Sequence, residues 1–470
     1  MNGRGVIRAG KVIRVLFVQG KSVGHIQAAI AVAGRLRDLG CDVTFTGPPS
    51  LAEKVGQSGF PCVPDPIFQS YPLPIGVGRR PADLARLLRS PRRAWTKVRE
   101  ARAVLKTFEA SASRIGARMR EIWQEHSPDL VVFDPFLLYY YAPIHNLGAK
   151  CISLSSKQPL HPWSSAPPYT SHFVIRETIA SKAWCFFLWL KRAIAYWLWC
   201  KWEETLFGTS PRRFAAVLSS ASGFPLKHQW QSRYVATDVK LRAVEEWLLQ
   251  APELGFPGEA SNAGTCYIGP LARELGDASG RWREHRAAHV LVVLTTVHRP
   301  SSAAALRRDR FMAELLAAAC AFPHLEFCIS TGPNFHLPPD RSRPKNIRVA
   351  EWLPVSELLA NCQVVICQAG NNLVRECLLL GKRLIVFPDA ADQPGTAARL
   401  AFHKLARRGD FRRPSAREIA SLIKSTLADP DASERQRWAQ SVCRHYADTP
   451  DALQLALDQA LRETKRPAVH

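Results

Sequence analysis

The chain has 470 residues, with 63 Lys or Arg against 40 Asp or Glu, and a formal net charge of +23. That length exceeds what one hydrophobic core usually supports, so two domains are expected. A composition with 47% hydrophobic and 22% charged residues excludes a largely disordered chain. The basic balance favours anionic partners such as acidic lipid or phosphorylated substrates, but a generally basic surface explains it equally well. No nucleic-acid-binding motif occurs, so nucleic acid is not expected as a partner.

The twelve cysteines form no C-x-x-C pair, and most lie in apolar segments. We therefore expect buried, reduced thiols and no zinc site. The first eleven residues are basic and lead directly into a short strand, without the features of a secretory peptide. These observations predict a cytoplasmic protein.

Apolar runs alternate with helical patterns along the chain. Strands are expected at 12–18, 42–46, 130–133 and 150–154, and, after residue 255, at 289–295, 326–330, 346–350, 364–367 and 383–387. Helices are expected around 29–36 and at 311–322. This alternation predicts an α/β fold made of doubly wound domains with parallel sheets.

A Gly- and Pro-containing stretch at 256–264 has the composition of a linker and suggests where the domains divide. We place an N-terminal domain at 12–255, with a variable Trp-rich insert at 155–245. A C-terminal domain follows at 265–430, and C-terminal helices with a tail occupy 431–470. Leu453, Leu457 and Leu461 predict an amphipathic helix that must pack on a partner surface.

A glycine turn at 368–372 joins an expected strand to an expected helix at 373–380. Backbone N–H groups at a helix N-terminus bind phosphate well. Glu376 lies one turn into that helix, where a carboxylate could hold a ribose diol. Asp392 and Gln393 follow the next strand and could bind sugar hydroxyls. The segment therefore predicts a nucleotide-sugar site.

Two further residues stand at the carboxyl ends of expected strands, where ligands bind in open α/β sheets. His25 could act as a general base, although a lone histidine at a helix start is often a surface or capping residue. Asp134 could orient His25, and equally could cap the following turn. Trp352 could stack on a base or belong to the core, and Thr296 is a weaker candidate for contact with phosphate.

The segment 182–202 contains five tryptophans. Lys191 and Arg192 interrupt its middle, which argues against a transmembrane helix. Trp, Tyr, Lys and Arg together suit a membrane interface or an apolar acceptor pocket, and a plain core helix pair is the alternative. The candidates for lining an acceptor pocket are Trp184, Phe187, Trp197 and Trp199.

Taken together, residues 12–440 resemble the GT-B glycosyltransferases of family 1, the UDP-glycosyltransferase and macrolide glycosyltransferase group. The resemblance is carried by the Gly24-His25 turn, the segment 128–134 ending in Asp134, the Trp352-Leu-Pro354 element and the donor signature. That signature comprises Gly370, Asn372, Glu376, Asp392 and Gln393. The family implies two Rossmann-like domains facing across a cleft, with a C-terminal helix packing back.

The resemblance also implies an inverting transfer of a hexose from a UDP- or dTDP-sugar, with no metal and no cofactor. His25 would deprotonate the acceptor hydroxyl and Asp134 would orient it. The resemblance places Trp352 on the base, Glu376 on the ribose, and the pair Asp392 and Gln393 on the sugar. The remaining donor-site candidates are Thr296, Gln368, Gly370, Asn371 and Asn372.

The Trp-rich insert lies where this family shapes its acceptor pocket, so the acceptor is expected to be lipophilic: a natural product, terpenoid, carotenoid or lipid. The basic charge would allow docking on an anionic membrane, on its inner face. Gln368 and Leu373 stand where the family usually has a histidine and a Ser or Thr near phosphate. Two alternatives therefore stay open: a peripheral-membrane glycolipid synthase, and a degenerate, non-catalytic partner protein.

Overall fold

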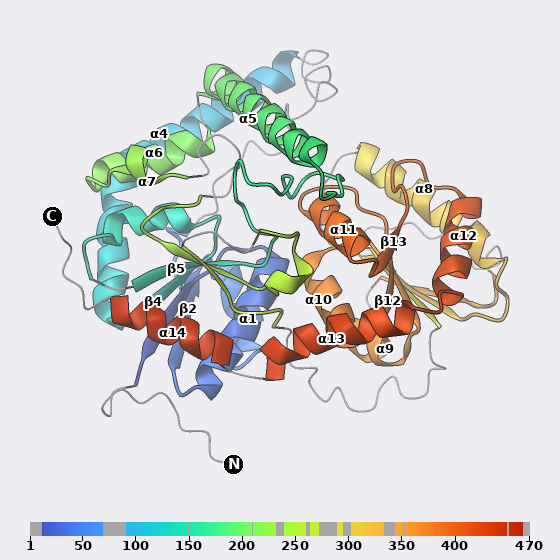
Figure 1. The fold of residues 1–470 in the computed structure, drawn as a ribbon. Helices are drawn as coiled ribbons and strands as arrows, with labels where there is room; N and C mark the ends of the chain where they lie inside the picture. The colour runs from blue at the N-terminus through green and yellow to red at the C-terminus, as the bar shows by residue number, and fades with distance from the viewer. Residues whose placement is uncertain are drawn as a thin grey trace.

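The structure is a computed structural model of the whole chain. It describes residues 12–68, 91–148, 150–208, 210–231, 239–259, 264–271, 289–294, 302–332, 344–351, 353–448 and 451–463. Two parallel sheets, each covered by helices, form the two halves of the molecule (Figure 1). The expected doubly wound α/β architecture is confirmed.

The first sheet has the strand order β3-β2-β1-β4-β5-β6-β7. Its strands are β1 (Arg14–Val18), β2 (Asp42–Gly47), β3 (Cys62–Pro64), β4 (Leu130–Phe133), β5 (Lys150–Ser155), β6 (Glu245–Leu248) and β7 (Thr265–Tyr267). The helices of this half are α1 (Val23–Asp38), η1 (Pro49–Leu51), α2 (Ala52–Gly56), α4 (Pro91–His126), η2 (Leu138–Ile144), α5 (Ile179–Phe207), α6 (Pro211–Ala221), α7 (Leu226–Gln229) and η3 (Pro252–Leu254). The central strands are buried along nearly their whole length, as expected for strands covered on both faces.

The second sheet has the order β10-β9-β8-β11-β12-β13. Its strands are β8 (Val290–Val293), β9 (Phe327–Ser330), β10 (Ile347–Ala350), β11 (Val364–Cys367), β12 (Arg383–Val386) and β13 (Ala406–Arg408). Its helices are α8 (Ser302–Ala319), α9 (Val355–Asn361), α10 (Asn371–Leu379), α11 (Gln393–Phe402) and α12 (Ala416–Leu427).

Both sheets reverse their strand order beside their first strand, between β1 and β4 and between β8 and β11. Ligands bind in open α/β sheets at such switch points, outside the carboxyl ends of the strands. Val18 at the end of β1 is in register with Phe133 at the end of β4. The residues that follow these two strands are therefore brought to the same edge of the sheet.

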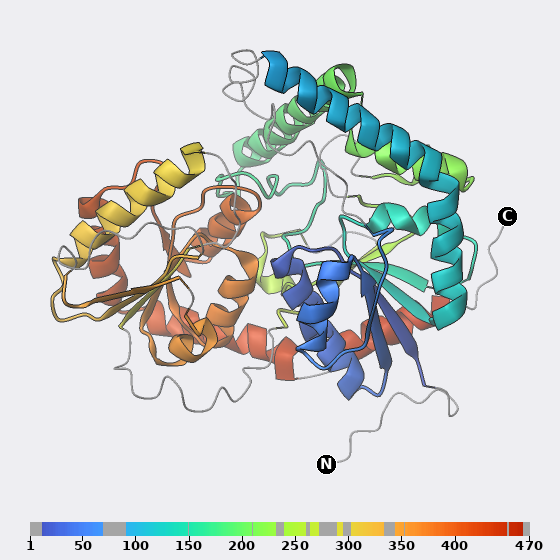
Figure 2. The same ribbon diagram turned by 180° about the vertical axis from the view of Figure 1, so that it is seen from behind.

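Two C-terminal helices tie the halves together (Figures 1 and 2). Helix α13 (Ala432–Asp448) packs on the second half, where Ala439 and Cys443 join its core. Helix α14 (Asp451–Glu463) buries Leu453, Leu457 and Leu461 in the core of the first sheet. The predicted amphipathic helix is thus present, and the expected packing back onto the N-terminal half is confirmed.

Strand β7 belongs to the first sheet, although the C-terminal domain was expected to begin at residue 265. Cys266 in β7 is in register with Trp247 of β6, so the first sheet continues past the linker-like stretch. The described part of the second sheet begins at Val290. A three-residue strand with half-buried side chains has too weak an apolar pattern to be recognised from sequence.

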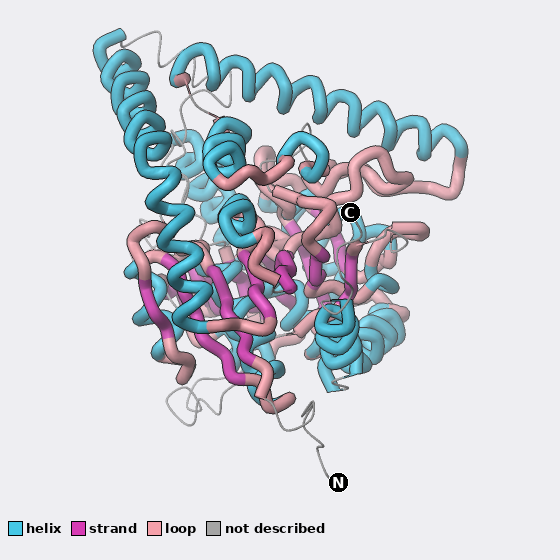
Figure 3. Tube along the Cα trace, turned by 90° about the vertical axis from the view of Figure 1, so that its left-hand side faces the viewer, coloured by secondary structure: helices cyan, strands magenta, loops and turns pink. Residues whose placement is uncertain are grey.

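The Trp-rich segment forms one continuous helix, α5, and not the helix pair considered as an alternative. Helix α5 contacts α4 on the outside of the first half (Figure 3). The C-terminal part of α4 packs through Ile115 and Met119 in the core beside the strands. In the described part of the chain, no helix combines the length and the apolar character that crossing a membrane requires. All twelve cysteines are free, and most are buried, as expected.

The two halves meet at backbone level where Gly395 of α11 faces Tyr169. The Gly395 amide donates to the Tyr169 carbonyl at 2.7 Å. A Cβ added at Gly395 would lie 2.2 Å from that oxygen and 2.6 Å from the Tyr169 Cα. Only glycine permits this approach.

We predict that Gly395→Ala destabilises the chain by on the order of 1–3 kcal/mol, because the added methyl group must push two backbones apart. Gly34→Ala in α1 is the matched control, since its Cβ would meet nothing within 4 Å. That control should be neutral or stabilising by up to about 1 kcal/mol. Urea denaturation of both variants measures the difference, and equal stabilities would contradict the close approach.

Candidate active site in the cleft

His25 and Asp134 are in contact at the switch point of the first sheet. His25 Nδ1 lies 3.1 Å from each Asp134 carboxylate oxygen. The Asp134 side chain is 1% exposed and that of His25 is 13% exposed. With Nδ1–H donating to the carboxylate, Nε2 is left as the proton acceptor. This is the arrangement of a base and its orienting group.

Asp134 also fulfils the structural role considered for it, because its Oδ1 accepts from the Phe136 amide at 2.9 Å. The Phe136 ring in turn stacks on the His25 imidazole, with centroids 5.1 Å apart and planes 2° apart. The same turn therefore fixes both the carboxylate and one face of the imidazole.

The Asp134 carboxylate is held in its charged form. Burial alone would raise its pKa, but the charge and hydrogen bond of His25, the Phe136 amide and the charge of Lys157 together lower that pKa below the usual value. The aspartate can therefore stabilise the imidazolium that forms when His25 takes a proton.

The expected phosphate-binding turn lies at the switch point of the second sheet. Gly370 is the N-cap of α10, and no side chain caps this helix end. The first-turn N–H groups of α10 are thus directed at the position where an anion would bind. The left-handed residue of the turn is Ala369, with φ of 60°, while Gly370 is extended. Ala391, with φ of 58°, precedes Asp392 in the same way, and such non-glycine conformations concentrate at functional sites.

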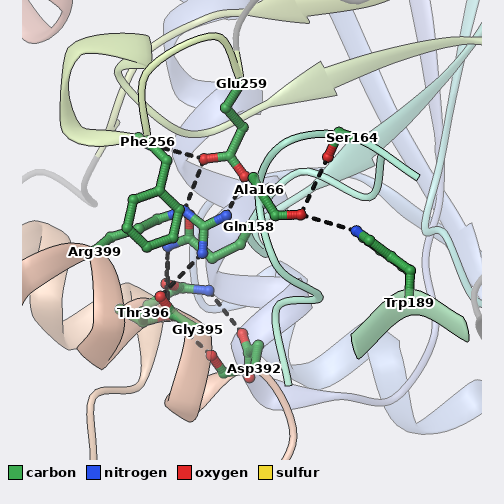
Figure 4. A network of polar contacts seen from close by, with 12 residues as sticks. Gln158, Ser164, Ala166, Trp189, Phe256, Glu259, Asp392, Gly395, Thr396 and Arg399 are labelled. Atoms are coloured by element: carbon green, nitrogen blue, oxygen red, sulfur yellow. Dashed lines mark hydrogen bonds and ion pairs between the residues drawn. The ribbon is translucent and has the colours of Figure 1, made fainter. Parts of the chain in front are cut away.

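Asn371 is buried in a polar network that crosses between the halves. Figure 4 labels its partners Gln158, Asp392 and Thr396. Its Nδ2 donates to Asp392 Oδ2 at 2.7 Å, and its Oδ1 accepts from Thr396 at 2.8 Å and from Gln158 at 3.2 Å. Gln158 follows β5 of the first half. Asn371 therefore orients Asp392 and joins the two halves, in addition to the donor contact predicted for it.

Asn372 forms a second bridge across the cleft. Its Nδ2 donates to the Gly24 carbonyl at 2.9 Å, immediately before His25. Its Oδ1 accepts from Arg375, whose guanidinium also donates to the Leu249 carbonyl at 3.3 Å. Burial lowers the Arg375 pKa to about 10, partly offset by the carboxylates of Glu376 and Asp392. The predicted donor helix is thereby fixed against the helix that carries the predicted base.

The remaining predicted donor residues fall in different places. Gln368 is buried, and Glu376 is half-buried one turn into α10. Gln393 is also buried, and its Oε1 accepts from the amides of Asp389 and Ala390 at 2.9 and 3.1 Å, so it braces the loop before Asp392. Trp352 and Thr296 lie outside the described residues.

Among the described residues, no group of three or more His, Cys, Asp or Glu side chains could hold a metal ion. Metal independence stays a prediction.

A pocket of about 770 Å³ opens beside these residues. One face of α5 forms part of its wall, through Leu188, Lys191, Arg192, Ala195, Tyr196 and Trp199. The loop 168–172 and, from the second half, Ala391 and Asp392 complete most of the lining. Phe136 and Lys157 connect the pocket with the His25–Asp134 pair.

The predicted acceptor-lining aromatics divide between two faces of α5. Trp199 is among the residues that line this pocket. Trp184, Phe187 and Trp197 lie outside the lining and are between 45% and 48% exposed. Trp197 and Trp199 are two residues apart and so point to different sides of the helix. The contact of all four with an acceptor stays a prediction.

Two groups important for the cleft were not predicted from sequence. Gln158 carries no motif, and its role depends on the docking of the two halves. Arg399 of α11 pairs with Glu259, both side chains being 3% exposed, and its NH1 also donates to the Gly395 carbonyl at 3.0 Å (Figure 4). The Phe256 amide donates to the same glutamate at 3.0 Å.

Known proteins share this architecture and sequence pattern, although no family model matches the chain. Over 95% of its length it is 23% identical to the oleandomycin glycosyltransferase of Streptomyces antibioticus, covering 89% of that protein. It is 27% identical to the zeaxanthin glucosyltransferase of Pantoea ananas, over 22% of the chain and 24% of that protein. It is 22% identical to the mouse UDP-glucuronosyltransferase 3A1, over 60% of the chain and 52% of that protein.

Two solved structures agree in fold over their full length. The kitacinnamycin glycotransferase superposes with a TM-score of 0.62 over 96% of this chain, at 18% identity. The glycosyltransferase VinC, solved in complex with dTDP, superposes with a TM-score of 0.60, also over 96%, at 14% identity. The chain is a glycosyltransferase with the GT-B fold, similar in sequence to proteins that carry out glycosyl transfer. In this glycosyltransferase the two halves are the paired Rossmann-like domains of the fold.

The lowered pKa of Asp134 predicts a pH-dependent contribution to stability. A carboxylate with a depressed pKa stabilises the folded state above its unfolded pKa of about 3.9, and that contribution is lost as the pH falls through the folded pKa. Asp134→Asn should therefore lower the free energy of unfolding at neutral pH, and the deficit should shrink below about pH 4. Asp38→Asn, at an exposed aspartate of α1, is the control and should change little. A deficit for Asp134→Asn that does not vary with pH would contradict this account.

Proposed function

We propose that this glycosyltransferase transfers a hexose from a UDP- or dTDP-sugar to a hydroxyl group of a lipophilic acceptor, with inversion and without a metal ion. The observation that carries the proposal is the His25–Asp134 pair facing the uncapped N-terminus of α10 across the cleft. The similarity to proteins named for oleandomycin and zeaxanthin, and to one solved with dTDP, supports these substrate classes.

In this proposal His25 Nε2 takes the proton from the acceptor hydroxyl while Asp134 stabilises the imidazolium. The acceptor oxygen forms its bond to the anomeric carbon as the bond to the nucleoside diphosphate breaks on the opposite side, so the configuration inverts. The N–H groups of α10 stabilise the charge that develops on the leaving phosphate. Glu376 holds the ribose, and Asp392, oriented by Asn371, holds a sugar hydroxyl.

We predict that His25→Ala reduces transfer by at least about a hundredfold, because the general base is removed. Binding of UDP or dTDP should be retained, as the donor residues lie on the other domain. Product formation from a panel of nucleotide sugars and hydroxylated acceptors measures the first effect, and calorimetry measures the second. His228→Ala, at an exposed histidine, is the control.

The same experiment separates the enzyme from a non-catalytic partner protein. Transfer retained by His25→Ala would exclude His25 as the base. A wild-type chain that binds neither UDP nor dTDP, with no rise in its melting temperature, would favour the degenerate alternative. Gln368 and Leu373 are the residues that motivate that alternative.

A second candidate, a glycolipid synthase on an anionic membrane surface, is favoured by the outer face of α5. This outer face consists of Trp184, Phe186, Phe187, Leu190, Ile194, Trp197 and Leu198, each between 40% and 55% exposed. Lys182, Lys191 and Lys201 are exposed on the same helix. An apolar face flanked by lysines suits the headgroup region of an anionic bilayer.

We predict that the wild-type chain co-sediments with vesicles containing anionic phosphatidylglycerol. The triple substitution of Trp184, Phe187 and Trp197 by Gln should reduce the bound fraction severalfold, because the apolar area that inserts is lost. Trp199→Gln, on the pocket face of the same helix, should bind vesicles like the wild type. Equal binding by the triple variant, or no binding by the wild type, would exclude the membrane-bound candidate.

A further inference from the structure

The pocket beside the His25–Asp134 pair is positively charged as well as apolar. Lys157, Lys191 and Arg192 line it, together with the aromatic residues Phe136, Tyr169, Tyr196 and Trp199. Among the described residues that line the pocket, Asp392 is the only carboxylate, and its Oδ2 already accepts from Asn371. A purely lipophilic ligand would use the aromatic residues of this lining and would leave its positive charge unused.

Arg192 is built into the wall of this pocket. Its NH1 donates to Thr170 Oγ1 at 2.8 Å, and its guanidinium lies 5.2 Å from the centre of the Tyr169 ring. Its Nε is buried and has no hydrogen-bond partner among the described residues. The contacts with Thr170 and Tyr169 hold the guanidinium at the pocket wall, so its position is fixed before a ligand binds.

Lys191 and Lys157 also line the pocket. Lys191 is exposed at the edge of α5, next to Arg192. Lys157 Nζ lies 4.0 Å from the centre of the Phe136 ring, which stacks on His25. The charge of Lys157 also reaches Asp134. An anion held by Lys191 and Arg192 would therefore belong to a molecule that can reach the His25 side of the cleft.

We propose that the acceptor carries an anionic group, a carboxylate or a phosphate, which Lys191 and Arg192 bind while its hydroxyl faces His25. This inference rests on the proposed transfer to an acceptor hydroxyl and specifies the chemical class of that acceptor: an apolar body with one hydroxyl and one anionic group. Arginine and lysine donors form their strongest hydrogen bonds with such groups.

The test uses probes of matched shape. Hydroxynaphthoate carries an apolar body, a hydroxyl and a carboxylate, whereas its methyl ester lacks only the charge. Naphthyl phosphate provides the phosphate counterpart. Binding to the full chain is measured by calorimetry, first without UDP and then with UDP at saturation, so that no transfer is needed and the filled donor site can be compared with the empty one.

We expect the wild type to bind hydroxynaphthoate or naphthyl phosphate about tenfold more tightly than the methyl ester. Substituting Lys191→Gln together with Arg192→Gln should remove this preference and leave binding of the ester unchanged. Lys191→Gln alone, at an exposed position that should not affect folding, should remove part of it. The matched control is Lys182→Gln with Lys201→Gln, which removes two charges from α5 outside the pocket lining and should keep the preference.

Three outcomes would overturn the proposal. Equal affinity for hydroxynaphthoate, naphthyl phosphate and the ester, or no binding of either anion, would show that the pocket does not select a charge. A preference that survives the double substitution would place the anion elsewhere. Binding of the anions that disappears when UDP is added would assign these cations to the donor. Because the readout is binding, a failure here is distinguishable from loss of transfer in His25→Ala.

Discussion

The active-site geometry depends on buried polar contacts that hold the two Rossmann-like domains face to face. The Arg399–Glu259 pair is almost completely buried, and further bonds to Gly395 and Phe256 satisfy its remaining atoms. Burying two charges is costly, and such a pair contributes only when its geometry is fixed and its other donors and acceptors are satisfied. These contacts therefore determine the relative orientation of the two domains more than the free energy of their association.

Docking matters because neither domain contains the whole site. The predicted base follows a strand of the first sheet, and the predicted phosphate-binding turn follows a strand of the second. Asn372 connects them directly, since it bonds the backbone beside His25 and sits in the first turn of α10. A displacement of either domain would move His25 relative to the N-terminus of α10, and small misplacements of reacting groups have large effects on rate.

The sequence predicted the sheets well because buried parallel strands are continuous apolar runs, and β4 and β11 agree with the expected ranges residue for residue. It missed β6 because Glu245 and Glu246 open that strand, yet both side chains are buried and pair with Lys150 and Lys240. The His25–Asp134 contact could be predicted from the sequence because the carboxyl ends of parallel strands meet at one edge of the sheet.

The roles of Gln158, Arg399 and Glu259 could not be predicted. Their partners lie on the other domain or far along the chain, and no local pattern marks them.

Helix α5 shows why composition alone could not separate an acceptor pocket from a membrane interface. Both interpretations began from the same tryptophans and the same central charges. In the folded chain Lys191, Arg192 and Trp199 line the pocket, whereas Trp184, Phe187 and Trp197 lie outside its lining and are about half exposed. The charges that argued against a transmembrane span thus lie where they can bind a ligand. A helix that places both cations and apolar side chains along one pocket suits the amphipathic acceptor proposed above, because such a molecule can contact both kinds of side chain at once.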